Sequence, residues 1–203
     1  RVLGVKTRQL NGDLQYRATG VIDNQLRTWS HLGLFDAPLN EANIPGYEKL
    51  VEVTNQTATL EHRVRSYLDA NCAHCHRPNG VAALFDARFT TPLPQQGLID
   101  GAVVNPLGIA GARIVAPRNP GQSLLHVRDS ALGPDQMPPL ARNVVDTNYI
   151  TALTAWILSL PLATPANLTA EPISVSAIQL TWDFPAPAAA SHWIERSYDG
   201  TNF

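Results

Sequence analysis

The sequence lacks the long apolar runs and the excess of basic residues that mark two large classes of protein. No apolar run approaches the roughly twenty residues that a helix needs to cross a bilayer, so no membrane span is expected. The formal net charge is -2, which argues against nucleic acid as a partner. With 203 residues, of which 44% are hydrophobic, the chain has the size and composition of one or two globular domains.

Sulfur is also scarce, because the chain holds only two cysteines and one methionine. The cysteines, Cys72 and Cys75, lie three positions apart, which makes them poor partners for a structural disulfide. A dithiol of the thioredoxin type would follow a strand in a βαβ pattern, whereas here a helical pattern leads into the pair. The two thiols therefore need another explanation.

Both cysteines belong to the motif Cys-Ala-His-Cys-His over residues 72–76, the pattern of covalent c-type haem attachment. On one helical turn Cys72 and Cys75 share a face, so each sulfur can bond to one vinyl group of the same porphyrin. His76 then lies beside the ring, where its imidazole can bind the iron from one side. His74 is a spacer residue and is expected to face away.

The single methionine, Met137, is the best candidate for the second iron ligand. A core methionine normally lies in an apolar run, but Met137 lies between an amide and two prolines on a predicted loop. Pro138 and Pro139 restrict the backbone, so the loop can present the thioether with little entropy left to lose. His126 is the one histidine that we regard as a competing ligand.

Two long amphipathic helices are predicted, one that leads into the cysteine motif and one that follows the methionine loop. The first runs from Leu60 into the cysteine motif, with Thr57 or Thr59 as its N-cap. The second covers residues 147–160, with Asp146 as N-cap and a proline as its stop signal. A turn over residues 119–123 opens a shorter middle helix. We expect the two long helices to pack together, with Tyr67 and Trp156 meeting there or lining a haem.

The motif at the end of one helix, the Met-Pro-Pro loop and the closing helix together resemble a class I cytochrome c domain, over residues 57–160. The resemblance implies a haem c whose iron is held by His76 and Met137. It also implies attachment of the haem outside the cytoplasmic membrane, in the bacterial periplasm or outside the cell. Arg113, Arg118 and Arg128 are candidates to pair with haem propionates, because a guanidinium offers two parallel donors to a carboxylate.

The two ends of the chain carry weaker signals. Residues 173–184 alternate in the way a strand does. The stretches 165–170, 177–182 and 193–203 together resemble the first three strands of a fibronectin type III module, with Trp182 in its core. About forty residues are too few for such a module, so we expect it to be poorly packed.

The first 55 residues, with Trp29 and Leu32 as apolar anchors and a linker over residues 38–45, resemble the segment that follows a pyrroloquinoline-quinone sugar dehydrogenase-like propeller.

The predicted fold class is therefore mainly α, a cytochrome c-like helical haem domain followed by a truncated β segment. The predicted organisation is an N-terminal linker with weak helices over residues 1–55, the haem domain over 56–161, a linker over 162–170 and the partial β module over 171–203. Since the chain begins without methionine and ends in a strand-like pattern, we expect a fragment of a larger secreted oxidoreductase.

Three functions are compatible with the motif. An electron carrier would use Cys72, Cys75, His76 and Met137 to hold haem iron, and would accept electrons from a dehydrogenase domain of the same or a partner protein. A haem enzyme or gas sensor would leave the distal site open, although no acid and base pair for it is evident in the sequence. A zinc module would use both thiols and two histidines, which lie too close together for easy tetrahedral geometry. We favour the carrier, and the sequence leaves open whether it acts as part of an enzyme.

Overall fold

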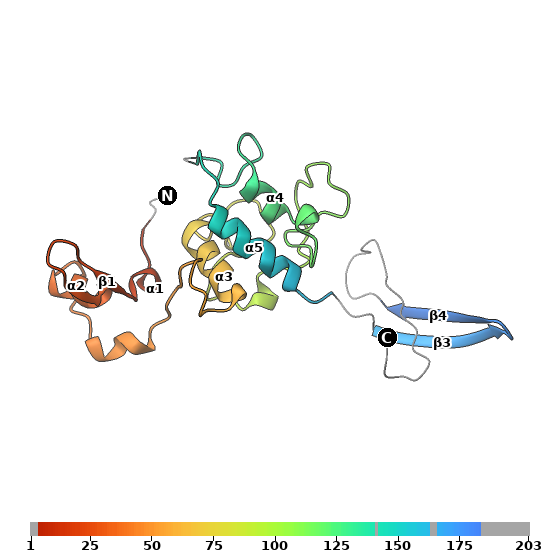
Figure 1. Ribbon diagram of the computed structural model, residues 1–203, viewed down its shortest axis with the longest axis horizontal. Coiled ribbons are helices and arrows are strands. Elements are labelled where there is room, and N and C mark those ends of the chain that lie inside the picture. Colours follow the sequence, from red (N-terminus) through yellow and green to blue (C-terminus); the bar gives the residue numbers. More distant parts are fainter. Residues whose placement is uncertain (1–3, 141, 163–165, 184–203) are drawn as a thin grey trace.

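The computed structural model describes residues 4–140, 142–162 and 166–183. Figure 1 shows three parts along the long axis, with α1 and α2 at one end, α3 to α5 in the middle and the β3–β4 hairpin at the other end. In chain order the elements are α1 (Thr7–Leu10), β1 (Asp13–Gln15), β2 (Ile22–Asn24), α2 (Gln25–His31), η1 (Glu41–Gly46), α3 (Leu60–Asn71), η2 (Leu93–Gln95), η3 (Pro120–Gln122), α4 (Leu124–Ser130), α5 (Thr147–Ser159), β3 (Ala166–Ser174) and β4 (Ala177–Asp183).

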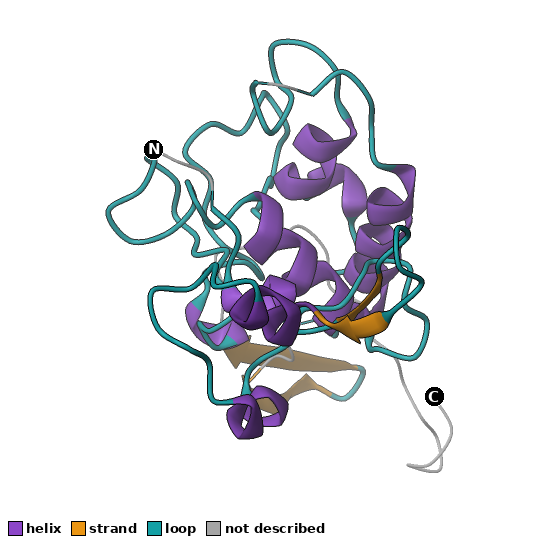
Figure 2. Ribbon diagram, turned by 90° about the vertical axis from the view of Figure 1, so that its left-hand side faces the viewer, coloured by secondary structure: helices purple, strands orange, loops and turns teal. Residues whose placement is uncertain are grey.

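The predicted fold class, mainly α, is wrong. Of the described residues 31% are helical and 14% are in strands, and the strands form two small antiparallel hairpins, drawn in orange in Figure 2. The helices found from sequence do form, but the long interval between the cysteine motif and α4 folds mostly as turns and loops. That interval is held together by hydrogen bonds between loop backbones and not by helices; one example runs from the Asp86 N–H to Gln96 O at 2.7 Å.

The first long helix, α3, begins and ends where its local sequence predicts. The Thr59 side chain accepts a hydrogen bond from the His62 N–H at 3.2 Å, so Thr59 is the N-cap and Thr57 is not. Val64 and Leu68 are fully buried on one face of α3. Cys72 is the C-cap residue, which places the motif directly at the end of the helix.

Helix α5 packs against α3, as predicted, and the two helices form the centre of the core. The Asp146 side chain caps α5 by accepting a hydrogen bond from the Tyr149 N–H at 3.0 Å. The aromatic contact differs from the expected one, because Tyr67 stacks on Tyr149 with ring centroids 3.6 Å apart and planes at 6°. Trp156 is instead a buried core residue farther along α5.

The predicted middle helix is also present, preceded by the short turn η3. The Asn119 side chain accepts from the Gln122 N–H at 3.1 Å, and Ser123 Oγ donates to the carbonyl oxygens of Ala116 and Asn119. These bonds place α4 against α5 and leave its Leu124 and Leu125 buried.

The N-terminal part has its own small core, formed by Leu10, Leu26 and Ile44, with Trp29 packed against it. Leu32, the second expected anchor, is 67% exposed, and Leu26 at 1% exposure takes that role. Strands β1 and β2 pair antiparallel here, although their largely exposed residues carry no alternating pattern that would have revealed them.

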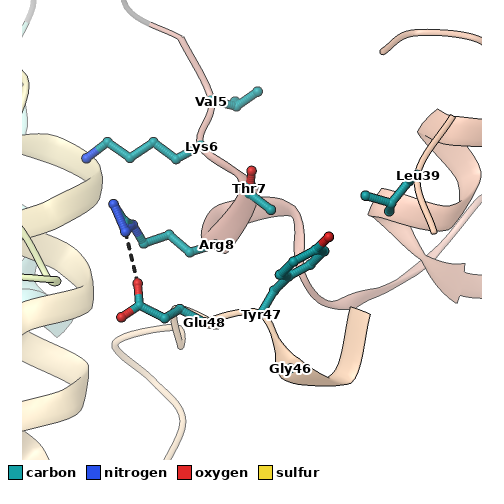
Figure 3. Close-up of a pocket in the computed structure, with 8 residues that line it drawn as sticks. All are labelled: Val5, Lys6, Thr7, Arg8, Leu39, Gly46, Tyr47 and Glu48. Atoms are coloured by element: carbon teal, nitrogen blue, oxygen red, sulfur yellow. Dashed lines mark hydrogen bonds and ion pairs between the residues drawn. The ribbon is translucent and has the colours of Figure 1, made fainter. Parts of the chain in front are cut away.

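A buried carboxylate joins this N-terminal part to α3. Asp69 is fully buried, and its carboxylate lies 2.9 Å from Lys6 Nζ and 3.3 Å from Arg8 Nε. In Figure 3 both basic side chains extend toward a helix, and Arg8 also pairs with Glu48 at 3.0 Å. Asp69 accepts a further bond from the Phe89 N–H at 2.9 Å, so three segments meet at one side chain.

The C-terminal hairpin differs in its bounds from the expected strand. β3 begins at Ala166 and pairs antiparallel with β4, so the stretch 165–170 contributes to a strand, as its fibronectin-like pattern predicts, and the linker predicted over residues 162–170 is shorter than expected. Leu168 and Ile178 are 63% and 66% exposed, and Trp182 is half-buried. The strand predicted over residues 193–203 lies outside the described residues. Among the described residues, no helix has the length and apolar character needed to span a membrane.

Candidate functional site

The cysteine motif forms one helical turn immediately after α3. The Cys72 N–H donates to Leu68 O at 2.8 Å, and the N–H groups of Cys75 and His76 both donate to Cys72 O, at 3.0 and 2.9 Å. Both cysteines are free and half-buried. The helical turn that the spacing predicts is therefore present.

The following loop is packed tightly onto this turn. The Val81 N–H donates to Cys75 O at 3.1 Å, and the Ala87 N–H donates to His76 O at 2.9 Å. At Gly80 a Cβ atom would lie 2.0 Å from Cys75 O, so a side chain cannot fit there without moving the motif. The loop thus holds the thiols and the imidazole in place through their backbones.

The turn opens onto a cavity of about 330 Å³, which lies within the size range of small-molecule and cofactor sites. All four predicted site residues line it: Cys72, Cys75, His76 and Met137. Most of the remaining wall is apolar, with side chains from the loop after the motif, the 103–114 region and α4: Val81, Leu84, Phe85, Val103, Ile114, Leu124 and Leu125. The fold thus brings together a thiol pair, an imidazole and a thioether from segments about sixty residues apart.

The His76 imidazole stacks on the Phe85 ring. The two ring centroids lie 4.4 Å apart with planes at 18°. Its Nδ1 atom is buried and has no hydrogen-bond partner in the described structure. Burial lowers the pKa of His76, and the charges of His74 and Arg128 lower it further, so the ring is neutral near pH 7. A neutral imidazole has a lone pair available to a metal.

The loop that carries Met137 is held by side chains that the sequence did not single out. The Met137 N–H donates to Arg128 O at 3.0 Å, and the Arg142 guanidinium donates to Met137 O and Ala131 O. Gln136 accepts from the Gly133 N–H at 2.9 Å. The prolines restrict this loop, but the hydrogen bonds determine where its sulfur lies.

The Cys72 thiol lies in a buried environment close to negatively charged groups. Burial raises the pKa of Cys72, and the negative charges of Asp129 and Cys75 raise it further, so this thiol is protonated near pH 7. Thiolate is the form that binds metal and exchanges disulfides. Within the described part of the chain, no three His, Cys, Asp or Glu side chains gather closely enough to hold a metal ion.

A buried acid also lines the cavity. Asp129 is 6% exposed, and the Tyr149 hydroxyl donates to its carboxylate at 2.9 Å. Burial raises the pKa of Asp129 to about 7, even though the Tyr149 bond and the charges of Arg142 and Arg128 act to lower it. No motif in the sequence points to Asp129, but its position four after the buried Leu125 places it on the buried face of α4.

The other sequence candidates are placed differently. Of the three arginines, Arg128 lines the cavity, and its buried Nε has no partner in the described structure. Arg113 and Arg118 lie outside the cavity wall and donate to Ala112 O and Leu160 O. His126 forms a hydrogen bond with Thr154 at 3.0 Å. His126, Tyr67 and Trp156 are not among the described residues that line the cavity.

Comparisons of the chain with protein-family models, with curated proteins and with solved structures find no match. The geometry of this cavity is therefore the basis on which a function can be proposed.

Proposed function

We propose that this chain is an electron-transfer domain that holds one covalently attached haem c in the cavity at the end of α3. Thioether bonds from Cys72 and Cys75 would attach the porphyrin, and His76 and Met137 would bind its iron. The observation that carries the proposal is the convergence of these four residues on one largely apolar cavity. The two free thiols are also what such a group requires.

The bound haem would supply the one-electron chemistry, and the protein would position the group and determine its potential. Phe85 keeps the His76 ring in one orientation, and the apolar walls keep water away from the site. Arg142 and Gln136 hold the methionine loop so that its neutral thioether faces the cavity. A soft, neutral ligand of this kind favours the reduced state and raises the reduction potential.

Arg128 is the arginine best placed to pair with a haem propionate. It lines the cavity, and its buried Nε atom has no protein partner in the described structure. A guanidinium in such a position can donate to a carboxylate that enters with the ligand. The resemblance to class I cytochromes c further supports a location in the bacterial periplasm or outside the cell, with a dehydrogenase domain as electron donor.

The test is covalent haem attachment during expression in a host with haem-attachment machinery. We expect a low-spin haem spectrum and haem staining of the protein in a denaturing gel, both lost when Cys72 and Cys75 are both replaced by serine. The double variant removes both attachment points but keeps side chains of similar size. A double variant that still stains for haem, or a wild-type chain that gains zinc and no haem, would contradict the proposal.

A further inference from the structure

The carboxyl group of Asp129 is the feature of this cavity that electron transfer alone does not explain. Among the described residues that line the cavity, Asp129 carries the sole carboxyl group. It is 6% exposed, and its one described hydrogen bond comes from Tyr149, which is itself 2% exposed. A buried carboxylate costs free energy unless it is paired, so its presence beside a redox site suggests a role there.

The charged and titratable groups around Asp129 come from three directions. Tyr149 on α5 donates the hydrogen bond, and behind it Tyr67 of α3 stacks on the Tyr149 ring. Cys72, at the end of α3, interacts with Asp129 electrostatically. Arg128 on α4 and Arg142 on the methionine loop act on it through space, without a hydrogen bond. The arginine charges stop short of direct pairing, so the carboxyl group remains able to bind a proton.

We propose that Asp129 binds one proton from solvent when the site gains an electron, and releases it when the electron leaves. This inference rests on the proposed haem site. The electron comes from a donor protein, the proton joins a carboxylate oxygen of Asp129, and no other bond forms or breaks. The total charge of the cavity is therefore the same in the two redox states.

The physical reason is the low polarity of the cavity. An electron added to a buried site makes nearby carboxylates harder to ionise, because charges interact strongly where water is excluded. The pKa of Asp129 is about 7 before any redox change, so a modest shift changes its protonation near neutral pH. Tyr149 acts as a positioning residue, since its hydroxyl stabilises the ionised form and keeps this pKa from rising further.

The test is the reduction potential of the haem-loaded protein measured by spectroelectrochemistry between about pH 5 and pH 9. Uptake of one proton with each electron lowers the potential by about 59 mV per pH unit between the two pKa values that Asp129 has in the oxidised and reduced states, so the wild-type potential should fall by up to that amount per pH unit near pH 7. The Asp129→Asn variant should lose this dependence. The Tyr149→Phe variant should keep the dependence but shift it to higher pH, and Glu48→Gln, far along the chain from the cavity lining, should match wild type.

Infrared difference spectra of the same samples give a second readout. We expect a carboxylic acid band that appears on reduction in wild type and in Tyr149→Phe but not in Asp129→Asn. An unchanged pH dependence in Asp129→Asn, or a pH-independent wild-type potential, would overturn the inference while leaving the haem site in place. Samples that carry no covalent haem in a denaturing gel would overturn the proposed function and this inference with it.

Discussion

At the scale of single residues, the candidate site depends on close contacts between the cysteine motif and the loops around it. Gly80 lies against the carbonyl of Cys75, and Phe85 lies against the ring of His76. The methionine sulfur depends on a loop whose backbone is held by Arg142 and Gln136. Each of these contacts can be changed separately.

Replacement of Met137 by alanine should abolish sulfur coordination of the haem iron, because the chain has no other methionine. The expected result is loss of the far-red absorption band of the sulfur-to-iron bond, with the haem still covalently attached. Leu140→Ala is a matched control from the same loop, since this side chain is 79% exposed. If Met137→Ala keeps the band, the assignment of Met137 is wrong.

Replacement of Gly80 by alanine should displace the loop from the cysteine motif. The new Cβ would lie 2.0 Å from Cys75 O, and overpacking of this kind costs about 2 kcal/mol. We expect a lower midpoint of unfolding by denaturant and a smaller yield of haem-loaded protein. Gly46→Ala, where no atom lies within 4 Å of the added Cβ, should change neither. Equal effects of the two variants would contradict the steric argument.

At the scale of elements, α3 and α5 are helices whose local signals agree with their packing. Both are capped by a side chain at the position that the sequence indicates, and each buries one apolar face against the other. Because Cys72 is the C-cap of α3, the end of that helix determines where the motif lies. The stability of α3 therefore bears directly on the site.

Thr59→Ala should destabilise the protein by about 1 kcal/mol, because the His62 N–H loses the side chain that accepts its hydrogen bond. The measurement is the free energy of unfolding from a denaturant titration. Thr57→Ala is the control, since Thr57 is an exposed threonine two residues earlier that does not cap the helix. A cost for Thr57→Ala as large as that for Thr59→Ala would show that the cap is assigned to the wrong residue.

At the scale of the whole molecule, Asp69 joins the N-terminal part to the helical core. Its buried carboxylate pairs with Lys6 and Arg8 of the N-terminal part. Predicted domain boundaries at residues 55 and 161 stay predictions, but this contact shows that the first segment is attached to α3 and is more than a free linker.

Asp69→Asn should destabilise the protein by on the order of 3 kcal/mol, because it removes the charge that balances two cations and leaves them next to a buried amide. We also expect faster proteolysis in the first fifty residues. Glu48→Gln is the control, because this partner of Arg8 is largely exposed and surface pairs contribute at most about 1 kcal/mol. If the two variants behave alike, Asp69 does not provide the link.

The sequence by itself determined the features that depend on neighbouring residues. The cysteine motif, the cap Asp146, the choice of a threonine cap at residue 57 or 59 and the apolar faces of two helices are all local, because a helical turn and its cap involve residues three or four apart. Met137 was found for a related reason, since a lone methionine between polar residues and prolines stands out without any knowledge of the fold.

The tertiary structure decided everything that depends on segments distant in the chain. It placed Met137 in the same cavity as His76, it selected Arg128 from three candidate arginines, and it revealed Asp129 as a buried acid. It also showed that the helices are joined by long loops and accompanied by two hairpins, so the fold is not mainly α. Burial and long-range hydrogen bonds, which no local pattern encodes, are the physical reason for each of these differences.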